Sequence, residues 1–396
     1  MFVALWCYRT LMPAQRLYLD YNATAPLRPQ ARSAMVAAMD LVGNPSSVHA
    51  EGRAVRGLLD EARAKVAALL GADPRYVTFT SGGTEAANLV LSSSLRDRSG
   101  RVERLLIGAG EHPCVLEGHR FSPEQVVVVP LNPLGQLDLE ALGAALSAGS
   151  GRPLLALQHA NNETGVVQPI REAAALVHDA GGLLACDAVQ STGRLMESAL
   201  SLGADAVFIS AHKLGGPKGV GALALARGDL HIEVALIRGG GQERGLRSGT
   251  ENPIAIAGFG AAAESSHAHQ GELERLAALR DRFEAAARAE FPDAVVFGAG
   301  VERLVNTTGL AIPGLSAETL LIALDLAGLA ISSGSACSSG KVRPSHVLGA
   351  MGVPADLAKG ALRVSLGYGT SESDLESFCE TFKKTVRNIR ARRSQV

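Results

Sequence analysis

Apolar runs that alternate with helical stretches constrain the fold of this chain more than any other feature. From residue 76 onward the candidate strands are "YVTFTSG", "RLLIGAGEHP", "QVVVVPL", "PLLALQHANNETG", "GLLACDAVQS", "ADAVFISAHKLGG" and "GALALARG". Their apolar residues follow one another without alternating polar positions, which is typical of strands buried on both faces. Helices are expected between them, over 84–95 and 170–181. The pattern therefore predicts an α/β fold with a mostly parallel central sheet covered by helices on both sides.

A different rhythm begins near residue 261. One long helix is expected over about 261–291, with Glu272, Glu274, Arg275, Arg280 and Arg282 on its polar side. After it come a strand in "RLVNTTGLAIPG", a helix in "SAETLLIALDLAG" and a strand in "ALRVSLGYG". We interpret this part as a second, smaller α/β layer.

Length and charge exclude several classes of protein. The chain has 396 residues, which is enough for a large core and roughly two to three domains. Its net charge of -1 predicts neither direct nucleic-acid binding nor attachment to an anionic membrane. The apolar run near the N-terminus is too short to span a membrane and lacks the features of a signal peptide. Residues 1–16 are therefore interpreted as a leader.

The cysteines favour a reducing compartment, so we expect a cytoplasmic protein. There are five, an odd number, at wide spacings and without a C-x-x-C motif. A disulfide framework and a zinc site are therefore not expected, and no metal ligands are assigned. Cys114 and Cys186 are interpreted as small core residues at strand ends.

Polar side chains with useful chemistry follow the ends of separate strands. They comprise imidazoles, amides, a carboxylate, a hydroxyl and an amine: His112, Asn161, Asn162, Asp187, Gln190, Ser210, His212 and Lys213. A single histidine at a strand end is more often a cap than a catalyst. Because ligands of parallel sheets bind at the carboxyl ends of strands, the whole set predicts one shared site.

A glycine-rich turn supplies a candidate anion site. In "TSGGTE", Gly82 and Gly83 let the backbone approach a ligand, and Thr84 lies near the start of a helix. Free N–H groups and the helix dipole favour an anion there. The alternative is an ordinary glycine turn with a helix cap. The segment "GGPKG" at 215–219 lacks the Lys-Ser/Thr ending of a phosphate loop, so we reject that interpretation.

One ligand accounts for these groups together. Pyridoxal 5'-phosphate needs a lysine amine, a carboxylate at its ring nitrogen and an anion-binding helix end. Lys213 supplies the amine and Asp187 can keep the ring nitrogen protonated. Gln190 can hydrogen-bond the phenolic oxygen, and His112 can stack on the ring.

The motifs "SAHKLGGPKG", "DAVQSTG", "TSGGTEAANL", "HANNETGVVQPI", "GGGQERGLRSGT" and "SSGSACSS" resemble those of the NifS/IscS-type cysteine desulfurases. These enzymes belong to the class V aminotransferases, which have the aspartate aminotransferase-like fold-type I. The resemblance covers roughly residues 17–387 in the family's order. It implies a homodimer with a large cofactor-binding domain over 24–262. A small domain is expected from 17–23 together with 263–396.

The resemblance also implies a role for each matching residue. Those that hold the cofactor ring are Lys213, which carries it, with His112, Asp187 and Gln190. Those that bind its phosphate are Gly83, Thr84, Ser210 and His212, with Thr250 reaching the phosphate of the neighbouring subunit. Asn162 contacts the cofactor and, with Arg363, binds the substrate carboxylate. A guanidinium suits that task because it grips a carboxylate through two parallel hydrogen bonds.

Cys337 lies in "SSGSACSSG", where small residues leave nothing to bury a thiol. Structural cysteines are normally buried, so a reactive role is favoured. The resemblance matches Cys337 to the nucleophile that attacks the sulfur of L-cysteine and releases L-alanine. The persulfide then passes to an acceptor protein, chiefly a scaffold for iron–sulfur cluster assembly. Catalysis is thus assigned to Cys337, Lys213 and His112.

Two alternatives remain open from sequence. One is a pyridoxal-phosphate lyase or aminotransferase of the same fold, in which Cys337 is idle or selenocysteine is the preferred substrate. The other is a sulfur-relay or interaction protein without catalysis. The intact set of Lys213, Asp187, His112 and Cys337 favours the desulfurase over both.

Overall fold

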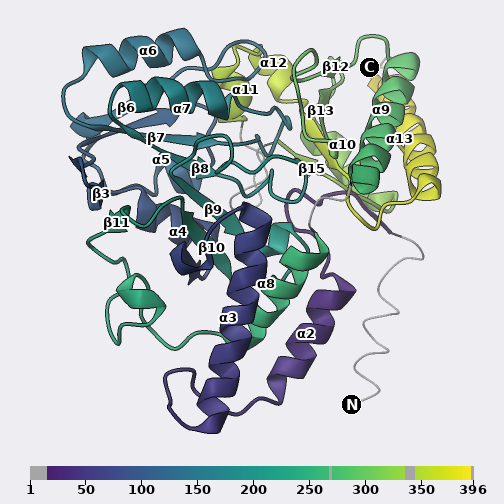
Figure 1. Ribbon diagram of the computed structural model, residues 1–396. Helices are drawn as coiled ribbons and strands as arrows, with labels where there is room; N and C mark the ends of the chain where they lie inside the picture. Colours follow the sequence, from purple (N-terminus) through teal and green to yellow (C-terminus); the bar gives the residue numbers. More distant parts are fainter. Residues whose placement is uncertain (1–15, 267–269, 335–343, 394–396) are drawn as a thin grey trace.

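A computed structural model describes residues 16–266, 270–334 and 344–393 of the protein (Figure 1). Its largest sheet has seven strands in the order β2-β10-β9-β8-β7-β5-β6. Their bounds are β2 (Val77–Thr80), β5 (Arg104–Gly108), β6 (Val126–Val129), β7 (Pro153–Gln158), β8 (Leu183–Asp187), β9 (Ala206–Ser210) and β10 (Gly221–Leu225). Neighbours from β9 to β6 run parallel, and β10 is antiparallel to both of its neighbours. The predicted α/β class with a mostly parallel sheet is confirmed.

Alternate residues of each central strand enter two different cores, which explains the uninterrupted apolar runs. On β5, the side chain of Leu106 packs on one face of the sheet, whereas those of Leu105 and Ile107 pack on the other face. The first face is covered by α3 (Ala50–Leu70), α6 (Leu139–Ala148), α7 (Ile170–Asp179) and α8 (Pro253–Ser265). The second is covered by α4 (Gly83–Val90) and α5 (Pro113–Leu116), and by the small sheet of β3 (Leu95–Asp97), β4 (Gly100–Arg101) and β11 (His231–Ile232).

Three helices, α2 (Pro29–Met39), α3 and α8, pack side by side in Figure 1. The contact between α3 and α8 depends on a residue without a side chain. A Cβ atom added to Gly260 of α8 would lie 2.7 Å from the Cα atom of Ala62 in α3. The two helix backbones therefore approach more closely here than any larger residue would allow.

The single helix expected over 261–291 is wrong, because α8 ends at Ser265 and α9 spans Gln270–Glu290. The two helices serve different cores: Phe259 packs against the large sheet, whereas Phe283 packs beside the smaller one. Two of the charged residues assigned to its polar side bind backbone carbonyls of the smaller layer. Arg275 donates to Tyr368 and Thr370, and Arg280 donates to the residues at 303 and 304.

The smaller layer joins the two ends of the described chain. Its sheet has the order β12 (Val295–Val296), β13 (Thr307–Ala311), β16 (Leu362–Ser365) and β15 (Ser332–Ser333), and it packs with α9, α10 (Ala317–Leu326) and α13 (Glu372–Arg393). Near the N-terminus, β1 (Leu17–Tyr18) pairs in parallel with β14 (Leu329–Ala330), and Asp20 bridges to Ser365 of β16. Two short helices, α11 (His346–Ala350) and α12 (Ala355–Ala358), complete this layer. The domain limits expected from sequence stay a prediction.

Among the described residues, no helix is both long and apolar enough to cross a membrane.

Candidate active site

The carboxyl ends of β2, β5, β7, β8 and β9 open into one cavity of about 340 Å³. Its lining residues come from the turns after these strands, from the segment after β1 and from β16: Asn22, Ala23, Gly83, Thr84, His112, Cys114, Gln158, Ala160, Asn162, Asp187, Val189, Gln190, Ser210, His212, Lys213 and Arg363. The predicted site residues line it except Asn161, Thr250 and Cys337. Asn161 is buried, and its side chain bonds the Gly110 carbonyl and the N–H groups of residues 163 and 164 instead. Thr250 is exposed and lies outside this cavity, and Cys337 falls outside the described residues.

The anion-binding end of the cavity is built at the start of α4. Gly83 is its first residue, and its backbone packs so closely that an added Cβ atom would lie 3.1 Å from the Val189 side chain. Ser210 and His212 face the same cavity from the end of β9. Burial and the nearby Lys213 lower the pKa of His212 to about 4, so its ring is neutral at pH 7. Free helix N–H groups, hydroxyls and a neutral imidazole form a donor set that fits a phosphate.

Asp187 is the buried carboxylate of the site. It ends β8 and accepts a hydrogen bond of 2.9 Å from the N–H of Val189. Burial raises its pKa to about 6, against the lowering effects of this hydrogen bond and of Lys213. A cation placed beside it would lower the pKa again. A buried carboxylate of this kind suits the protonated nitrogen of a pyridine ring.

His112 caps the short helix α5 and is held in one tautomer. Its Nδ1 accepts a hydrogen bond of 3.1 Å from the N–H of Cys114. Burial and the charges of Lys213 and His346 lower its pKa to about 4. The ring is therefore neutral at pH 7, with its proton on Nε2. A fixed, uncharged ring can stack on a planar cofactor.

Cys114 differs from the interpretation as a core residue, because it is half-buried and lines the cavity. Burial raises the pKa of its thiol, so it stays protonated and is a poor nucleophile. Cys186 does pack in the core below the sheet edge, as expected.

Lys213 reaches the cavity from a single helical turn after β9. Its Nζ donates to the carbonyl oxygens of Asn22, at 2.5 Å, and Ala23, at 2.9 Å. The Nε2 of Gln190 donates to the same Asn22 oxygen at 3.0 Å. The amine and the amide thus converge on one backbone carbonyl at the edge of the cavity.

The guanidinium of Arg363 has one nitrogen, Nε, without a hydrogen-bond partner among the described residues. Arg363 lies on β16 with its side chain 4% exposed, pairs with Asp20 at 2.8 Å, and donates to the carbonyl of Asn162 at 3.1 Å. Its Nε is buried and has no hydrogen-bond partner within the described part of the chain. A buried guanidinium N–H without a partner costs free energy. Arg363 also lines the cavity, where a guanidinium can bind a carboxylate.

Sequence reasoning missed Asp20 and Asn22. Both follow β1, which is only two residues long and so gives no apolar run to mark a strand end. Asn22 donates to the Asn162 carbonyl at 3.2 Å and to Thr307 Oγ1 at 2.9 Å. It therefore links the large sheet to the smaller one at the wall of the cavity.

The buried carboxyl of Glu163 was also missed. Its side chain accepts a hydrogen bond of 2.5 Å from Ser345 Oγ, and a Cβ atom added to Gly334 would lie 2.5 Å from its Oε2. Burial raises its pKa to about 7. Gly334 and Ser345 flank 335–343, the segment that contains Cys337 and lies outside the described residues. Glu163 thus contacts both sides of that segment.

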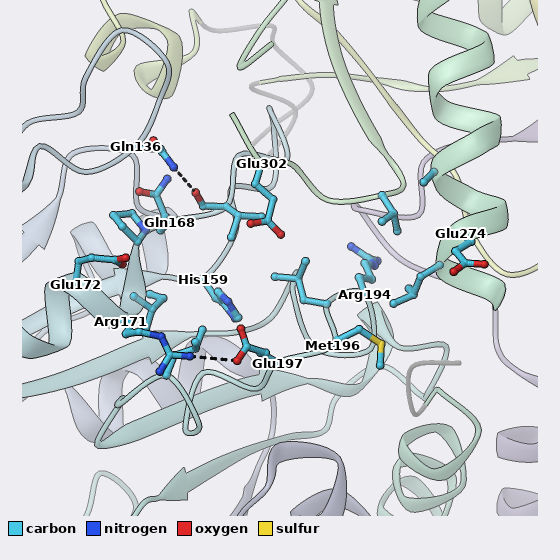
Figure 2. Close-up of a pocket in the computed structure, with 18 residues that line it drawn as sticks. Gln136, His159, Gln168, Arg171, Glu172, Arg194, Met196, Glu197, Glu274 and Glu302 are labelled. Atoms are coloured by element: carbon cyan, nitrogen blue, oxygen red, sulfur yellow. Dashed lines mark hydrogen bonds and ion pairs between the residues drawn. The ribbon is translucent and has the colours of Figure 1, made fainter. Parts of the chain in front are cut away.

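A larger cavity of about 800 Å³ lies between α7, α9 and the turn at 194–197 (Figure 2). Glutamates contribute much of its charge, and Figure 2 shows Arg171 paired with Glu197 beneath His159. It contains neither Lys213 nor Asp187. Nor do the described residues contain a cluster of three or more His, Cys, Asp or Glu side chains that could hold a metal ion.

Comparison with known proteins gives consistent matches. The family model "Aminotransferase class-V" matches residues 17–378. A "Cysteine desulfurase" of Cereibacter sphaeroides is 42% identical, over 95% of this chain and 97% of its own length. A "Cysteine desulfurase IscS" of Dictyoglomus turgidum is 37% identical, over 95% and 96% respectively.

Solved structures agree with these relatives. The NifS-like protein from Rickettsia africae superposes with a TM-score of 0.83 at 32% identity, covering 94% of this chain and all of its own. A structure described as "SspA in complex with cysteine" gives a TM-score of 0.74 at 28% identity, over 89% of this chain and 99% of its own.

Proposed function

This chain belongs to the class-V aminotransferase family, and because its relatives include proteins named cysteine desulfurase, we propose that it takes sulfur from L-cysteine and passes it on through Cys337. It is a pyridoxal-phosphate enzyme that converts L-cysteine to L-alanine. The observation that carries this function is the meeting of three groups in one cavity. These are the amine of Lys213, the buried carboxylate of Asp187 and the guanidinium of Arg363.

Pyridoxal 5'-phosphate, when bound, supplies a ring that stabilises negative charge at the α-carbon of an amino acid. Lys213 would attach it covalently, and Asp187 would hold its ring nitrogen. Gln190 would hydrogen-bond its phenolic oxygen, and His112 would stack on its face. The start of α4 and the neighbouring donors would bind the phosphate: Gly83, Thr84, Ser210 and His212. The donor set of the cavity supports this assignment.

Substrate recognition falls to Arg363 and Asn162. The guanidinium of Arg363, which lines the cavity, binds the carboxylate of L-cysteine, while the ion pair with Asp20 fixes its orientation. The side chain of Asn162 faces the cavity next to it. A charge-assisted hydrogen bond in a buried site is strong, so an amino acid without its carboxylate would bind poorly.

The amine of Lys213 is also the group that would move a proton within the cavity. Its Nζ stays within the cavity because η3 (Ala211–Lys213) holds its backbone at the end of β9. His112, neutral and with its proton on Nε2, is the second group that can pass a proton.

Cys337 carries the sulfur. Its thiolate forms an S–S bond to the substrate sulfur while the substrate C–S bond breaks. The carbon fragment keeps that electron pair and takes up a proton to become alanine. Glu163, through Ser345 and Gly334, lies beside both flanks of the segment that contains this cysteine.

The acceptor of the persulfide is an iron–sulfur scaffold protein, and the enzyme acts as a cytoplasmic homodimer. The relative named IscS supports the first proposal. Thr250 supports the second, because it is exposed and outside the cavity of its own subunit. In the dimer, Thr250 reaches the phosphate bound by the partner subunit.

Replacing Cys337 with serine tests the function. The hydroxyl has nearly the same size but negligible anion at neutral pH, so sulfide and alanine production should fall to background. Cofactor absorbance and its change on adding L-cysteine should remain. Cys379→Ser, on α13, is the matched control and should keep wild-type turnover. Sulfide release by Cys337→Ser at near the wild-type rate would make the thiol idle, as in the lyase alternative.

A further inference from the structure

Arg194 is a buried cation that no sequence motif singled out. It lies after β8, at the edge of the larger cavity in Figure 2, and is 9% exposed. Within the described part of the chain, its guanidinium donates only to uncharged oxygens. These are Asn22 Oδ1 at 2.9 Å, Gln190 Oε1 at 2.5 Å, the Gln190 carbonyl at 3.3 Å, the Lys213 carbonyl at 3.1 Å and the Tyr21 carbonyl at 3.3 Å.

The absence of a counter-charge makes Arg194 costly. It has no ion pair with a carboxylate in the described ranges, and a buried charge without one costs several kcal/mol. Burial lowers its pKa to about 10, so it nevertheless remains charged at neutral pH. An apolar side chain of similar volume would avoid this cost, so the charge itself or its hydrogen bonds must serve the site.

The hydrogen bonds fix the orientation of Gln190. A guanidinium has donors and no acceptor, so the Gln190 atom at 2.5 Å must be the amide oxygen. The amide nitrogen then lies on the opposite side, where it already donates to the Asn22 carbonyl and where Gln190 lines the cavity. Without Arg194, the side-chain amide could turn over and present its oxygen instead.

Asn22 is fixed in the same way. Its Oδ1 accepts from Arg194, so its nitrogen must point to the Asn162 carbonyl, which also accepts from Arg363. One guanidinium therefore orients an amide on the cofactor side of the cavity and another on the substrate side.

We propose that Arg194 is a positioning residue that holds Gln190 with its N–H groups toward the phenolic oxygen of the cofactor, and that its charge helps keep this oxygen anionic. The inference rests on the proposed binding of pyridoxal 5'-phosphate in this cavity. Both effects favour the deprotonated form of the link between Lys213 and the cofactor. Arg194 should therefore lower the pKa at which that link titrates.

The test is a pH titration of the visible absorbance of the purified holoenzyme, followed without substrate. Arg194→Met should raise the apparent pKa of the cofactor link by at least about one unit, since it loses both the charge and the fixed amide. Gln190→Met should raise it as well. In that background Arg194→Met should add less than it does alone, because part of its effect acts through Gln190.

Arg104 provides the matched control. Arg104 is buried as well, and among the described residues its side chain donates only to backbone carbonyls. It lies on β5, away from the cavity. Arg104→Met should lower the thermal midpoint and leave the cofactor pKa unchanged. If Arg194→Met behaves like Arg104→Met, the positioning role is overturned.

Two further outcomes are decisive. If Arg194→Met does not fold, Gln190→Met and Arg194→Lys carry the test. The lysine keeps a positive charge but has no second nitrogen like Nη2, which donates to the Tyr21 and Lys213 carbonyls and so holds the guanidinium in place. It should therefore orient the two amide oxygens less firmly, and the pKa of the cofactor link in Arg194→Lys should lie between those of wild type and Gln190→Met. An unshifted pKa in both overturns the inference. Wild-type protein without any titrating cofactor absorbance would instead overturn the proposed function.

Discussion

Asp187 shows how burial and charge set the chemistry of a single residue. It lies buried at the end of β8, and burial raises its pKa to about 6. A cation at the ring nitrogen of the proposed cofactor would be stabilised by this carboxylate. Asp187→Asn should retain the cofactor through Lys213 and α4, but an amide cannot stabilise the ring cation. Turnover should fall by about a hundredfold or more, as for other losses of electrostatic stabilisation.

The measurement is alanine production per bound cofactor. Asp205→Asn is the matched control, since Asp205 is equally buried but is paired with Arg227 away from the cavity. That variant should lose stability and keep its turnover per bound cofactor. An Asp187→Asn enzyme within a few-fold of wild type would remove Asp187 from the proposed role.

Glu163 predicts a pH-dependent contribution to stability. Its pKa is about 7 when folded, against 4.5 for the ordinary side chain, so the folded state binds the proton more tightly. This contribution is fully present below pH 4.5 and is lost as the pH rises through about 7. Relative to Glu163→Gln, which does not titrate, the wild type should lose on the order of 3 kcal/mol of unfolding free energy over that window.

Urea unfolding of wild type and Glu163→Gln at several pH values between 4.5 and 8 measures this difference. Ser345→Ala keeps the carboxyl but loses a hydrogen bond that lowers the pKa of Glu163, so its stability should fall with rising pH at least as much as that of wild type. If the free energy of unfolding changes with pH in the same way in wild type and Glu163→Gln, the carboxyl titrates alike in the folded and unfolded states, and the prediction is wrong.

Site residues at the ends of clearly apolar strands could be predicted from the sequence, whereas site residues elsewhere could not. Asp187 and Lys213 follow clear strands, so the rule that ligands bind at strand ends places them together. Arg194 lies in a turn well beyond the end of β8, and an arginine in a turn is normally interpreted as a solvated charge. Its importance depends on contacts with Asn22 and Gln190 that only the folded chain creates.

Among the elements, the contact of α3 with α8 makes a quantitative prediction. Gly260→Ala places a methyl group 2.7 Å from Ala62 Cα and should destabilise the protein by about 1–3 kcal/mol. This exceeds the gain of about 1 kcal/mol that alanine brings to a helix. Gly57→Ala, on the exposed side of α3 with no atom within 4 Å, should show only the gain.

Thermal unfolding of the two variants checks this pair of opposite signs. If Gly260→Ala and Gly57→Ala stabilise the protein equally, the two helices do not approach as closely as described. The cofactor content of both variants should stay at the wild-type level, because neither glycine lines the cavity.

The elements themselves were predictable where one sheet determined the pattern. The apolar strands of the large sheet were identified because both of their faces are buried. The helix expected over 261–291 failed because helical periodicity does not reveal which core a segment packs against. Alanine-rich α8 and charged α9 have similar propensities, yet they pack against different sheets.

At the scale of the whole molecule, the proposed dimer makes Thr250 a residue of the partner's site. Thr250→Ala should weaken cofactor affinity by about tenfold or more, the loss of one charge-assisted hydrogen bond. Co-expression with Lys213→Ala then separates the two possibilities. A mixed dimer contains one site with both native residues only if Thr250 acts across the interface.

The affinity of the remaining site, followed by cofactor absorbance at dilute protein, is the measurement. Mixed dimers should recover wild-type affinity in half of their sites, whereas each parent alone should not. Absence of recovery, or a fully active monomer in sedimentation, would contradict the proposed dimer.

The pairing of β1 with β14 and of Asp20 with Arg363 has a consequence for the order of events on the ribosome. Asn22 leaves the exit tunnel early, whereas Arg363 is made much later. At roughly 5–20 residues per second, about 20–70 s separate the two. During that interval the nascent chain can form its large sheet, but the wall proposed to bind the substrate carboxylate does not yet exist. The proposed release of sulfide from cysteine therefore cannot begin before β16 has been made and has paired with the segment after β1.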